Sequence, residues 1–428
     1  MMRFGARTPR QGKPIGRNAA ALQRYKRLYD YWWRYRTTGL GKAFVIGLVL
    51  SGSIGSASIV MPIFRLFCAI GALLGVALAA AWLMRPKLTL SATLPEKAVA
   101  GQKLQVELIA TNAGRFAARN VQAGFFNNPP SLVGDAGPVV QHIAPGEQSR
   151  LSAFLQPLRR GSYGPLRLRA WSTFPFNLYR TPCAKPAGGS LLVLPAFHRI
   201  GGVEIPVGAR YQPGGIALTS NVGESPEYIG NREYRFGDSM KRIDFKAWAR
   251  LARPAVREYQ EEYYCRIALV LDTFVPKGRK AGPEGFPDLE AAVSLCASVA
   301  DALAQGEYII DLFAAGPELY VFRAGRHTAH FENVLEILAC VEACRTNPFE
   351  KVTPALADEL SNISALVAVC LDWDASRSQL VQTARDHGCS VKLLVVRDSE
   401  TTEPLSTIDV PFSIFTPAQI VAGGIETL

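Results

Sequence analysis

Acidic and basic side chains alternate closely in one stretch of the chain, residues 232–250. They include Arg232, Asp238, Arg242, Asp244, Lys246 and Arg250. Arg242, Lys246 and Arg250 recur every four residues, so a helix would carry them as a basic stripe, and like charges at this spacing are mildly destabilising. An anion should therefore compensate them. The favoured anions are nearby acidic side chains of the same chain, which would form internal ion pairs with the stripe. An acidic partner surface or a phosphate is the alternative.

A turn and a helix are predicted to position these groups. Gly237 and Asp238 favour a turn, with Asp238 as the N-cap of a helix that starts near Ser239. Apolar residues then recur at helical spacing, which predicts one buried face. They are Met240, Ile243, Ala247 and Leu251.

Two further aspartates stand where predicted strands end. Asp272 follows the apolar run CRIALVL, and Asp372 follows ALVAVCL. Open α/β sheets bind ligands at this edge, although a strand-end aspartate also commonly caps a helix or closes a loop. Both interpretations stay open. Trp373 lies between Asp372 and Asp374, and we expect it to be exposed in a loop and to contact a partner.

Other catalytic patterns are missing from the sequence. It holds no P-loop, no G-x-S-x-G elbow, no C-x-x-C pair and no histidine spacing typical of a metal site. The sequence therefore predicts no catalytic residue, no cofactor and no bound metal.

The charged stretch resembles the signature of the bacterial family called domain of unknown function 58 (DUF58), roughly R-x-Y-x-x-G-D-x-x-R-x-I-x-W-K-x-x-A-R. The matching residues are Arg232, Tyr234, Gly237, Asp238, Arg242, Ile243, Lys246, Ala249 and Arg250. Phe245 replaces the usual Trp. A second element, from Arg159-Arg160-Gly161 to Leu178, resembles the family's R-R-G-x-Y … D-P-F-G-L. Phe174 and Asn177 stand there where Asp and Gly are usual, so that turn is expected to differ.

The resemblance implies a double membrane span, a β domain, the signature, and then a von Willebrand factor A-like domain. It also implies a MoxR-type AAA+ ATPase as partner. Domains of the A type bind a divalent ion through D-x-S-x-S after the first strand, with a distant Thr and Asp. Here Asp272 remains, but Phe274 and Pro276 replace both serines. Thr328 and Asp372 could be remnants of the distal pair. Because both serines are missing, however, the site is incomplete, and we expect no tight metal binding.

Two uncharged segments predict a membrane hairpin. Residues 43–61 and 66–84 contain no Asp, Glu, Lys or Arg, and each is 19 residues long. A helix of this length spans about 28 Å, which is enough to cross the hydrocarbon core of a bilayer. A buried hairpin in a soluble protein is the alternative.

The charge distribution predicts the orientation of the hairpin. Residues 1–42 contain eleven Lys and Arg against one acid, and the rest of the chain has a net charge near +1. By the positive-inside rule, both termini of an inner-membrane protein with two spans would be cytoplasmic. The basic and aromatic leader suits the anionic lipid of the inner leaflet. A nearly neutral body gives no support for nucleic-acid binding.

The sequence therefore predicts a multidomain protein: a transmembrane α-hairpin, an all-β immunoglobulin-like sandwich, and an α/β domain with a Rossmann-type parallel sheet of the von Willebrand factor A-like kind. The expected boundaries are a leader at 1–42, two spans within 43–84, the sandwich at 88–194, a linker at 195–231, the signature segment at 232–262 and the α/β domain at 263–428. We expect a membrane-anchored adaptor without enzymatic activity. A membrane-bound hydrolase that uses the signature's charged groups is the alternative.

Overall fold

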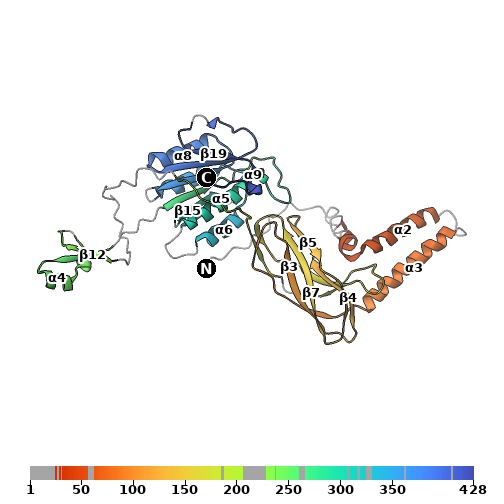
Figure 1. The fold of residues 1–428 in the computed structure, drawn as a ribbon. Helices are drawn as coiled ribbons and strands as arrows, with labels where there is room; N and C mark the ends of the chain where they lie inside the picture. Colours follow the sequence, from red (N-terminus) through yellow and green to blue (C-terminus); the bar gives the residue numbers. More distant parts are fainter. Residues whose placement is uncertain are drawn as a thin grey trace. The chain divides into compact units, whose positions relative to one another are not determined.

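The structure is a computed structural model that describes most of the chain. The described residues are 25–26, 28–29, 31–55, 62–184, 188–205, 228–236, 238–259, 266–306, 308–315, 319–323, 330–360, 363–405 and 408–428. The chain divides into two compact units, Met1–Val193 and Leu194–Leu428 (Figure 1).

The first unit begins with a helical hairpin. A π-helical turn, η1 (Tyr31–Arg36), precedes α2 (Gly39–Gly55) and α3 (Pro62–Leu83). Gly52 lies against Phe67, and Gly71 lies against Leu48, so the helices pack antiparallel. Among the described residues, α3 is the one helix long and apolar enough to cross a membrane, whereas the apolar α2 has 17 residues. The helix expected over 43–61 begins earlier, at Gly39, and its expected end at 56–61 lies outside the described residues.

The base of the hairpin packs on a loop of the same unit. Leu178 is buried together with Leu74 and Ala77 of α3. The Thr38 N–H donates to the Leu178 carbonyl at 3.1 Å. Gly41 comes so close that a Cβ at this position would lie 2.1 Å from the Leu178 carbonyl oxygen. Only glycine fits this contact between α2 and the loop.

The Gly41→Ala variant should therefore destabilise the first unit by about 1–3 kcal/mol, since the added methyl forces backbone apart. Gly39→Ala is the matched control in the same helix, because nothing lies within 4 Å of a Cβ there. It should leave stability unchanged or raise it by up to about 1 kcal/mol. Thermal unfolding in detergent measures both. Equal midpoints for the two variants would contradict the contact.

Antiparallel strands form the rest of the first unit. They are β1 (Leu88–Ala92), β2 (Lys97–Val99), β3 (Leu104–Asn112), β4 (Ala118–Phe125), β5 (Leu132–Ala136), β6 (Val140–Ile143), β7 (Gln148–Pro157), β8 (Gly161–Tyr163), β9 (Leu168–Ser172), β10 (Thr181–Ala184) and β11 (Leu191–Leu194). The strand orders are β1-β3-β7-β5, β10-β9-β4-β6 and β2-β11-β8. Alternate residues of β3 (Val106, Leu108) pack against Val121 and Ala123 of β4, so two sheets enclose one core. The predicted β domain is thus present as a sandwich.

Asn177, in the turn before β10, has a φ of 53°. This is the left-handed conformation that glycine adopts most easily and asparagine tolerates best among other residues. The expectation that this turn differs from the family's stays a prediction.

The second unit contains the signature segment and the α/β domain. The signature elements are β12 (Tyr228–Glu233), η2 (Met240–Arg242), α4 (Phe245–Leu251) and β13 (Ala255–Tyr259). The α/β elements are β14 (Arg266–Leu271), α5 (Pro287–Gln305), β15 (Ile309–Ala315), β16 (Leu319–Arg323), α6 (His330–Cys340), α7 (Phe349–Ala357), β17 (Ala365–Cys370), α8 (Ala375–Asp386), β18 (Ser390–Val396), β19 (Phe412–Phe415) and α9 (Pro417–Ala422).

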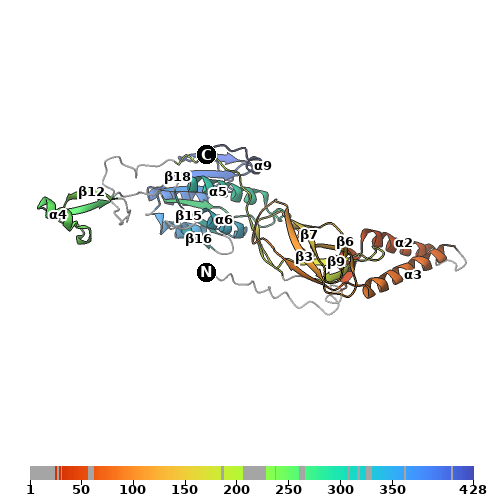
Figure 2. The same cartoon turned by 60° about the horizontal axis from the view of Figure 1, so that its bottom comes forward.

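The α/β domain is a six-stranded sheet in the order β16-β15-β14-β17-β18-β19, with helices on both faces (Figure 2). The pairs are parallel except β15–β16, which is antiparallel. That exception follows from the connection, because residues 316–318 are too few for the crossover that a parallel pair needs.

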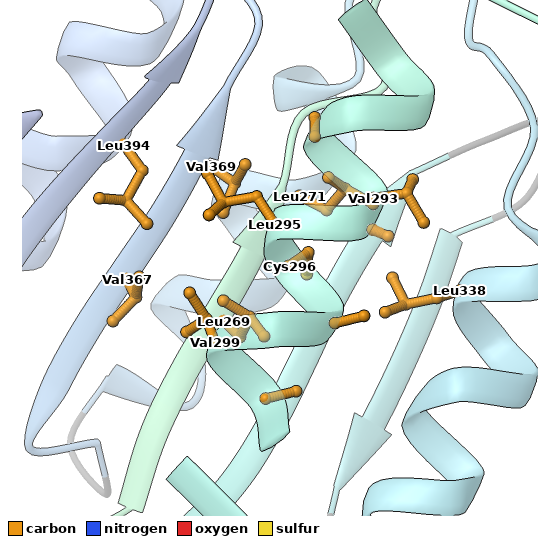
Figure 3. Close-up of a cluster of buried hydrophobic side chains, with 14 of the residues drawn as sticks. Leu269, Leu271, Val293, Leu295, Cys296, Val299, Leu338, Val367, Val369 and Leu394 are labelled. Carbon is orange, nitrogen blue, oxygen red and sulfur yellow. The ribbon is translucent and has the colours of Figure 1, made fainter. Parts of the chain in front are cut away.

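Alternation along β14 divides the core between the two faces. Leu269 and Leu271 pack with α5, α6 and α9, whereas Ala268 and Val270 pack with α7 and α8. Figure 3 shows the first face, where Leu295 and Val299 of α5 lie over the sheet. The strands read as continuous apolar runs because both faces are covered.

The start of the expected linker belongs to the α/β domain. Ile200 is buried in the α5 core, and the Gly201 N–H donates to the Glu426 carbonyl at 2.8 Å. The Lys392 ammonium donates to the Glu204 carbonyl at 2.9 Å. Residues 195–205 are thus held by the domain, and residues 206–227 lie outside the described residues.

Candidate functional site

The signature segment folds around a two-stranded hairpin. β12 and β13 pair antiparallel, with Arg232 opposite Val256, and η2 and α4 lie in the connection between them. Tyr234 is half-buried, and its N–H donates to the Pro254 carbonyl at 3.0 Å. Gly237 lies outside the described residues.

Asp238 is held in a bidentate ion pair. Arg232 Nη1 and Nη2 donate to its two carboxylate oxygens at 2.7 and 2.8 Å, and the Arg235 N–H donates to Oδ2 at 2.8 Å. The hydrogen bonds from the Arg232 side chain, and then from the Arg235 backbone, lower the pKa of Asp238 to about 2. The expectation that Asp238 is a helix N-cap is therefore wrong, because its oxygens face Arg232.

Asp244 is the helix cap instead. Its Oδ1 accepts from the Lys246 and Ala247 N–H groups at 3.0 Å each, and its Oδ2 accepts from Arg257 Nε at 3.2 Å. The backbone hydrogen bond from Ala247 is the main cause that lowers the pKa of Asp244. The single helix expected from Ser239 is interrupted because Ile243 is extended and bridges to Val256. Arg242 therefore lies on η2, and Lys246 and Arg250 on α4.

The Asp238→Asn variant should loosen the turn after β12. With a pKa lowered to about 2, the carboxylate stabilises the turn above pH of about 4 and loses this effect as the pH falls toward 2. At neutral pH the variant removes the charge outright, so the Arg235 amide should exchange with solvent about tenfold faster. Hydrogen exchange measures this. Glu233→Gln is the control, because Glu233 meets Arg253 only at 3.9 Å.

The basic groups of the signature face outward with two aromatic rings. Lys246, Arg250, Phe245 and Trp248 are exposed, and Phe245 stacks on Trp248 with ring centroids 6.0 Å apart. Within the described part of the chain, Arg242, Lys246 and Arg250 make no ion pair. We call Arg242, Phe245, Lys246, Trp248 and Arg250 the α4 surface. The signature's charges thus separate into internal pairs, at Asp238 and Asp244, and an outward cationic and aromatic face.

Asp272 meets an arginine that the sequence analysis does not single out. Arg377 Nε and Nη2 donate to Asp272 Oδ2 at 2.9 and 2.6 Å, and both side chains are almost completely buried. The Phe274 and Leu371 N–H groups also donate to this carboxylate, each at 2.9 Å. Burial disfavours the charged form of Arg377, but the nearby negative groups, with Asp272 first among them, together raise the pKa of Arg377.

The residues around Asp272 do not fit a divalent cation. Arg377 already places a positive charge on Oδ2, and its guanidinium carbon lies 5.9 Å from the ring centroid of Phe274. Phe274 and Pro276 supply no side-chain oxygen, although magnesium sites are built from oxygen ligands. Within the described residues, no three His, Cys, Asp or Glu side chains gather at one point. Thr328 lies outside the described residues.

Asp372 closes a loop. It accepts from the Thr402 hydroxyl at 2.7 Å and the Thr402 N–H at 2.9 Å, and it pairs with Arg397. These contacts fit the interpretation that Asp372 closes a loop. Trp373 is 3% exposed and packs with the α7 and α8 core, so the expectation of an exposed tryptophan is wrong. A charged neighbour on each side does not prevent burial, because Asp372 and Asp374 turn toward polar partners.

A signal for Arg377 exists in the sequence. Residues 377, 380, 381 and 384 have helical spacing, and in α8 they are Arg377, Leu380, Val381 and Ala384, all buried. An arginine on an otherwise apolar helix face indicates a buried anion. Asp374 also accepts from this arginine, so the two aspartates enclose it.

Residues 230–400 match a protein-family model described as "Protein of unknown function DUF58". The match begins in β12 and ends after β18, so it contains the α4 surface and the Asp272–Arg377 pair. It supports the DUF58 resemblance of this region. No curated protein matches the chain.

Solved structures resemble parts of the chain only distantly. Two are structures of a CARDB domain from Pyrococcus furiosus, one by NMR and one a crystal structure in complex with di-metal ions. They have 13% and 14% identity, cover 25% and 26% of this chain and 94% and 90% of theirs, and have TM-scores of 0.18 and 0.17. The secreted serine protease VesC from Vibrio cholerae has 12% identity and a TM-score of 0.19, covering 28% of this chain and 26% of its own. These TM-scores carry no argument about fold or function.

Proposed function

We propose that this protein is a membrane-anchored adaptor that binds a protein partner through the α4 surface. The carrying observation is the separation of charges in the signature segment. Its acids Asp238 and Asp244 are engaged internally, whereas Lys246 and Arg250 share the short helix α4 with two exposed aromatic rings, and the half-buried Arg242 lies on η2. Surfaces that combine arginine and aromatic side chains are typical of binding hot spots. The positive charge of the α4 surface favours a partner with an acidic surface.

The anchoring part of the proposal rests on the hairpin. α3 is long and apolar enough to cross a bilayer, and the apolar α2 packs along it. Thr38, before α2, is bonded to Leu178, which follows α3 in the chain. Segments that precede and follow the hairpin thus meet on one side, which requires an even number of crossings. The basic leader makes that side cytoplasmic. Reporters at both termini should be active in the cytoplasm, and one active only outside would contradict this topology.

We further infer that the sandwich is immunoglobulin-like and that the α/β domain is a von Willebrand factor A-like domain with a degenerate metal site. The two packed antiparallel sheets support the first inference. An open, mostly parallel sheet covered on both faces supports the second, and Arg377 replaces the cation at its strand-end aspartate. Such a domain would serve as a rigid support for recognition rather than as a magnesium-dependent binding module.

The family resemblance identifies a MoxR-type AAA+ ATPase as the partner to test. The full chain in detergent would be immobilised and titrated with the purified ATPase encoded in the same genome. The Lys246→Glu/Arg250→Glu variant should weaken binding at least tenfold, because two attractive contacts become repulsive. Lys277→Glu is a charge-reversal control outside the α4 surface, since Lys277 is exposed in a loop of the α/β domain.

Two results would overturn the proposal. One is equal binding by the α4 variant and the Lys277→Glu control, which would place the partner surface elsewhere. The other is turnover of a phosphoester or peptide substrate by the purified chain, which would favour the hydrolase alternative. Asp238→Ala is unsuitable as a surface test, because it breaks the bidentate pair with Arg232.

A further inference from the structure

The first unit contains a cavity of about 250 Å³ between η1 and the sandwich. Its walls come from η1, the end of β4, β5, β9 and the segment that leads into β10. The Arg180 N–H donates to the Arg36 carbonyl at 2.6 Å, and Thr37 bridges to Tyr179. Backbone hydrogen bonds therefore hold η1 against the sheet, and the cavity is part of the folded unit.

Four arginines line this cavity: Arg34, Arg36, Arg169 and Arg180. Within the described part of the chain, none of them makes an ion pair. The acid in the lining is Asp135, which is exposed and makes no ion pair with them. An excess of three positive charges in a partly closed space strongly favours an anion.

Aromatic rings hold two of these guanidinium groups in place. Arg169 lies 4.0 Å from the ring centroid of Phe126, and Arg180 lies 5.6 Å from that of Trp171. Tyr35 packs on the same Phe126 ring at 4.1 Å. Stacking on aromatic faces orders the planar groups in advance, so less conformational entropy is lost when a ligand binds.

Two buried donors in the lining have no acceptor. Arg36 Nε and Trp171 Nε1 are shielded from solvent, and neither has a hydrogen-bond partner. The great majority of buried donors in proteins have a hydrogen-bond acceptor. Two buried donors without an acceptor in one cavity therefore indicate a missing acceptor. Burial also lowers the pKa of Arg180, a cost that a bound anion would offset.

We propose that this cavity binds a phosphate-bearing anion. Guanidinium groups from separate segments suit the several oxygens of a phosphoryl group, and each can donate two parallel hydrogen bonds. Pockets for drug-sized ligands start near 300 Å³, so this smaller space fits a headgroup or a free phosphate.

The position of the cavity favours a lipid headgroup as the source. α2 begins at Gly39, shortly after Arg36, so the cavity lies next to the start of the hairpin. If the hairpin spans a membrane, as proposed above, the phosphates of anionic lipids lie at this depth. Soluble inorganic phosphate offers the same chemistry, and the experiment must separate the two.

The test uses the full chain in a non-ionic detergent. Short-chain phosphatidylglycerol and inorganic phosphate are titrated separately, with diacylglycerol and sodium chloride at equal ionic strength as their controls. Tryptophan fluorescence and the thermal midpoint report binding, and Trp171→Phe identifies the signal that comes from the cavity wall. Tighter binding of the lipid indicates a headgroup site, and equal or tighter binding of inorganic phosphate indicates a soluble ligand. Either result supports the anion site.

Variants locate the site. Arg169→Gln and Arg180→Gln should each weaken binding about tenfold, because each removes a charge-assisted hydrogen bond. Asp135→Asn should strengthen it by removing the opposing charge. Arg150→Gln is the control, since Arg150 is exposed on β7 and does not line the cavity.

Two outcomes would overturn the proposal: no response of the wild-type chain to either probe beyond its control, or an equal loss of binding in Arg150→Gln. The wild-type titrations decide the question even where a variant fails to fold. The result is also separate from partner binding, because a chain that binds phosphate but not the ATPase would refute the proposed partner and keep this site.

Discussion

Replacing Arg377 with methionine should destabilise the α/β domain by about 3–5 kcal/mol. The substitution keeps an unbranched apolar side chain but removes the guanidinium that meets Asp272. A fully buried carboxylate would then lose its ion-pair partner, and breaking one side of a buried pair usually costs this much. Hydrogen exchange of the β14 and β17 amides measures the opening free energy of this region directly.

Two further variants make the interpretation specific. Arg385→Met, also on α8, removes an arginine whose partner Asp409 is almost completely exposed, and it should cost less than about 1 kcal/mol. Adding Asp272→Asn to Arg377→Met removes the stranded charge while an oxygen remains for the Phe274 and Leu371 amides. This double variant should regain most of the lost stability. If Arg377→Met costs no more than Arg385→Met, the pair does not stabilise the domain.

Truncating Trp373 to alanine should destabilise the same domain by about 3–5 kcal/mol, because it empties a large volume in the core beneath α7 and α8. Trp248→Ala is the matched variant. Trp248 is 38% exposed and stacks on Phe245, so its removal should change stability by less than about 1 kcal/mol. Hydrogen exchange of β17 and β18 gives the first value, and exchange of β12 and β13 gives the second.

The two tryptophans should behave oppositely in partner binding. Trp248→Ala removes part of the α4 surface and should weaken binding of the ATPase, whereas the conservative Trp373→Phe should leave it unchanged. The reverse pattern would show that the loop after β17, and not α4, contacts the partner.

Under the degenerate-site interpretation proposed above, the Asp272–Arg377 pair would take the place of an ion at this strand end. In a metal-dependent site, a cation holds together the loop after the first strand and the loop after a distant one. Here Arg377 connects Asp272, after β14, with Asp374, after β17, from within the chain itself. A covalently attached cation cannot dissociate, so this edge of the sheet would be independent of magnesium concentration.

The sequence predicts many elements of the fold correctly because local patterns determine them. Apolar residues recur at helical spacing over 288–305, and Gly306, a typical C-cap residue, follows them. The α5 helix accordingly runs from Pro287 to Gln305 and ends at Gly306. Nearly continuous apolar runs identify β14, β17 and β18, since strands covered on both faces have few polar positions. Hydrophobic periodicity is a property of a few adjacent residues, and it is visible without the rest of the chain.

Predictions that concern individual side chains are less successful, because their contacts come from distant residues. Asp238 and Asp244 have equally suitable types for a helix cap, and only the pairing of β12 with β13 assigns the cap to Asp244. Trp373 lies between two acids and reads as a loop residue, yet the packing of α7 and α8 buries it.

The amino-acid sequence by itself determines the apolar hairpin segments, the basic leader, the strand and helix types and the signature residues, because each depends on composition or short spacing. Tertiary structure alone decides that Arg377 reaches Asp272, 105 positions earlier in the chain, and that four arginines from three segments gather around one cavity. Such groupings depend on how the sheets stack and how loops close, and no local pattern records them.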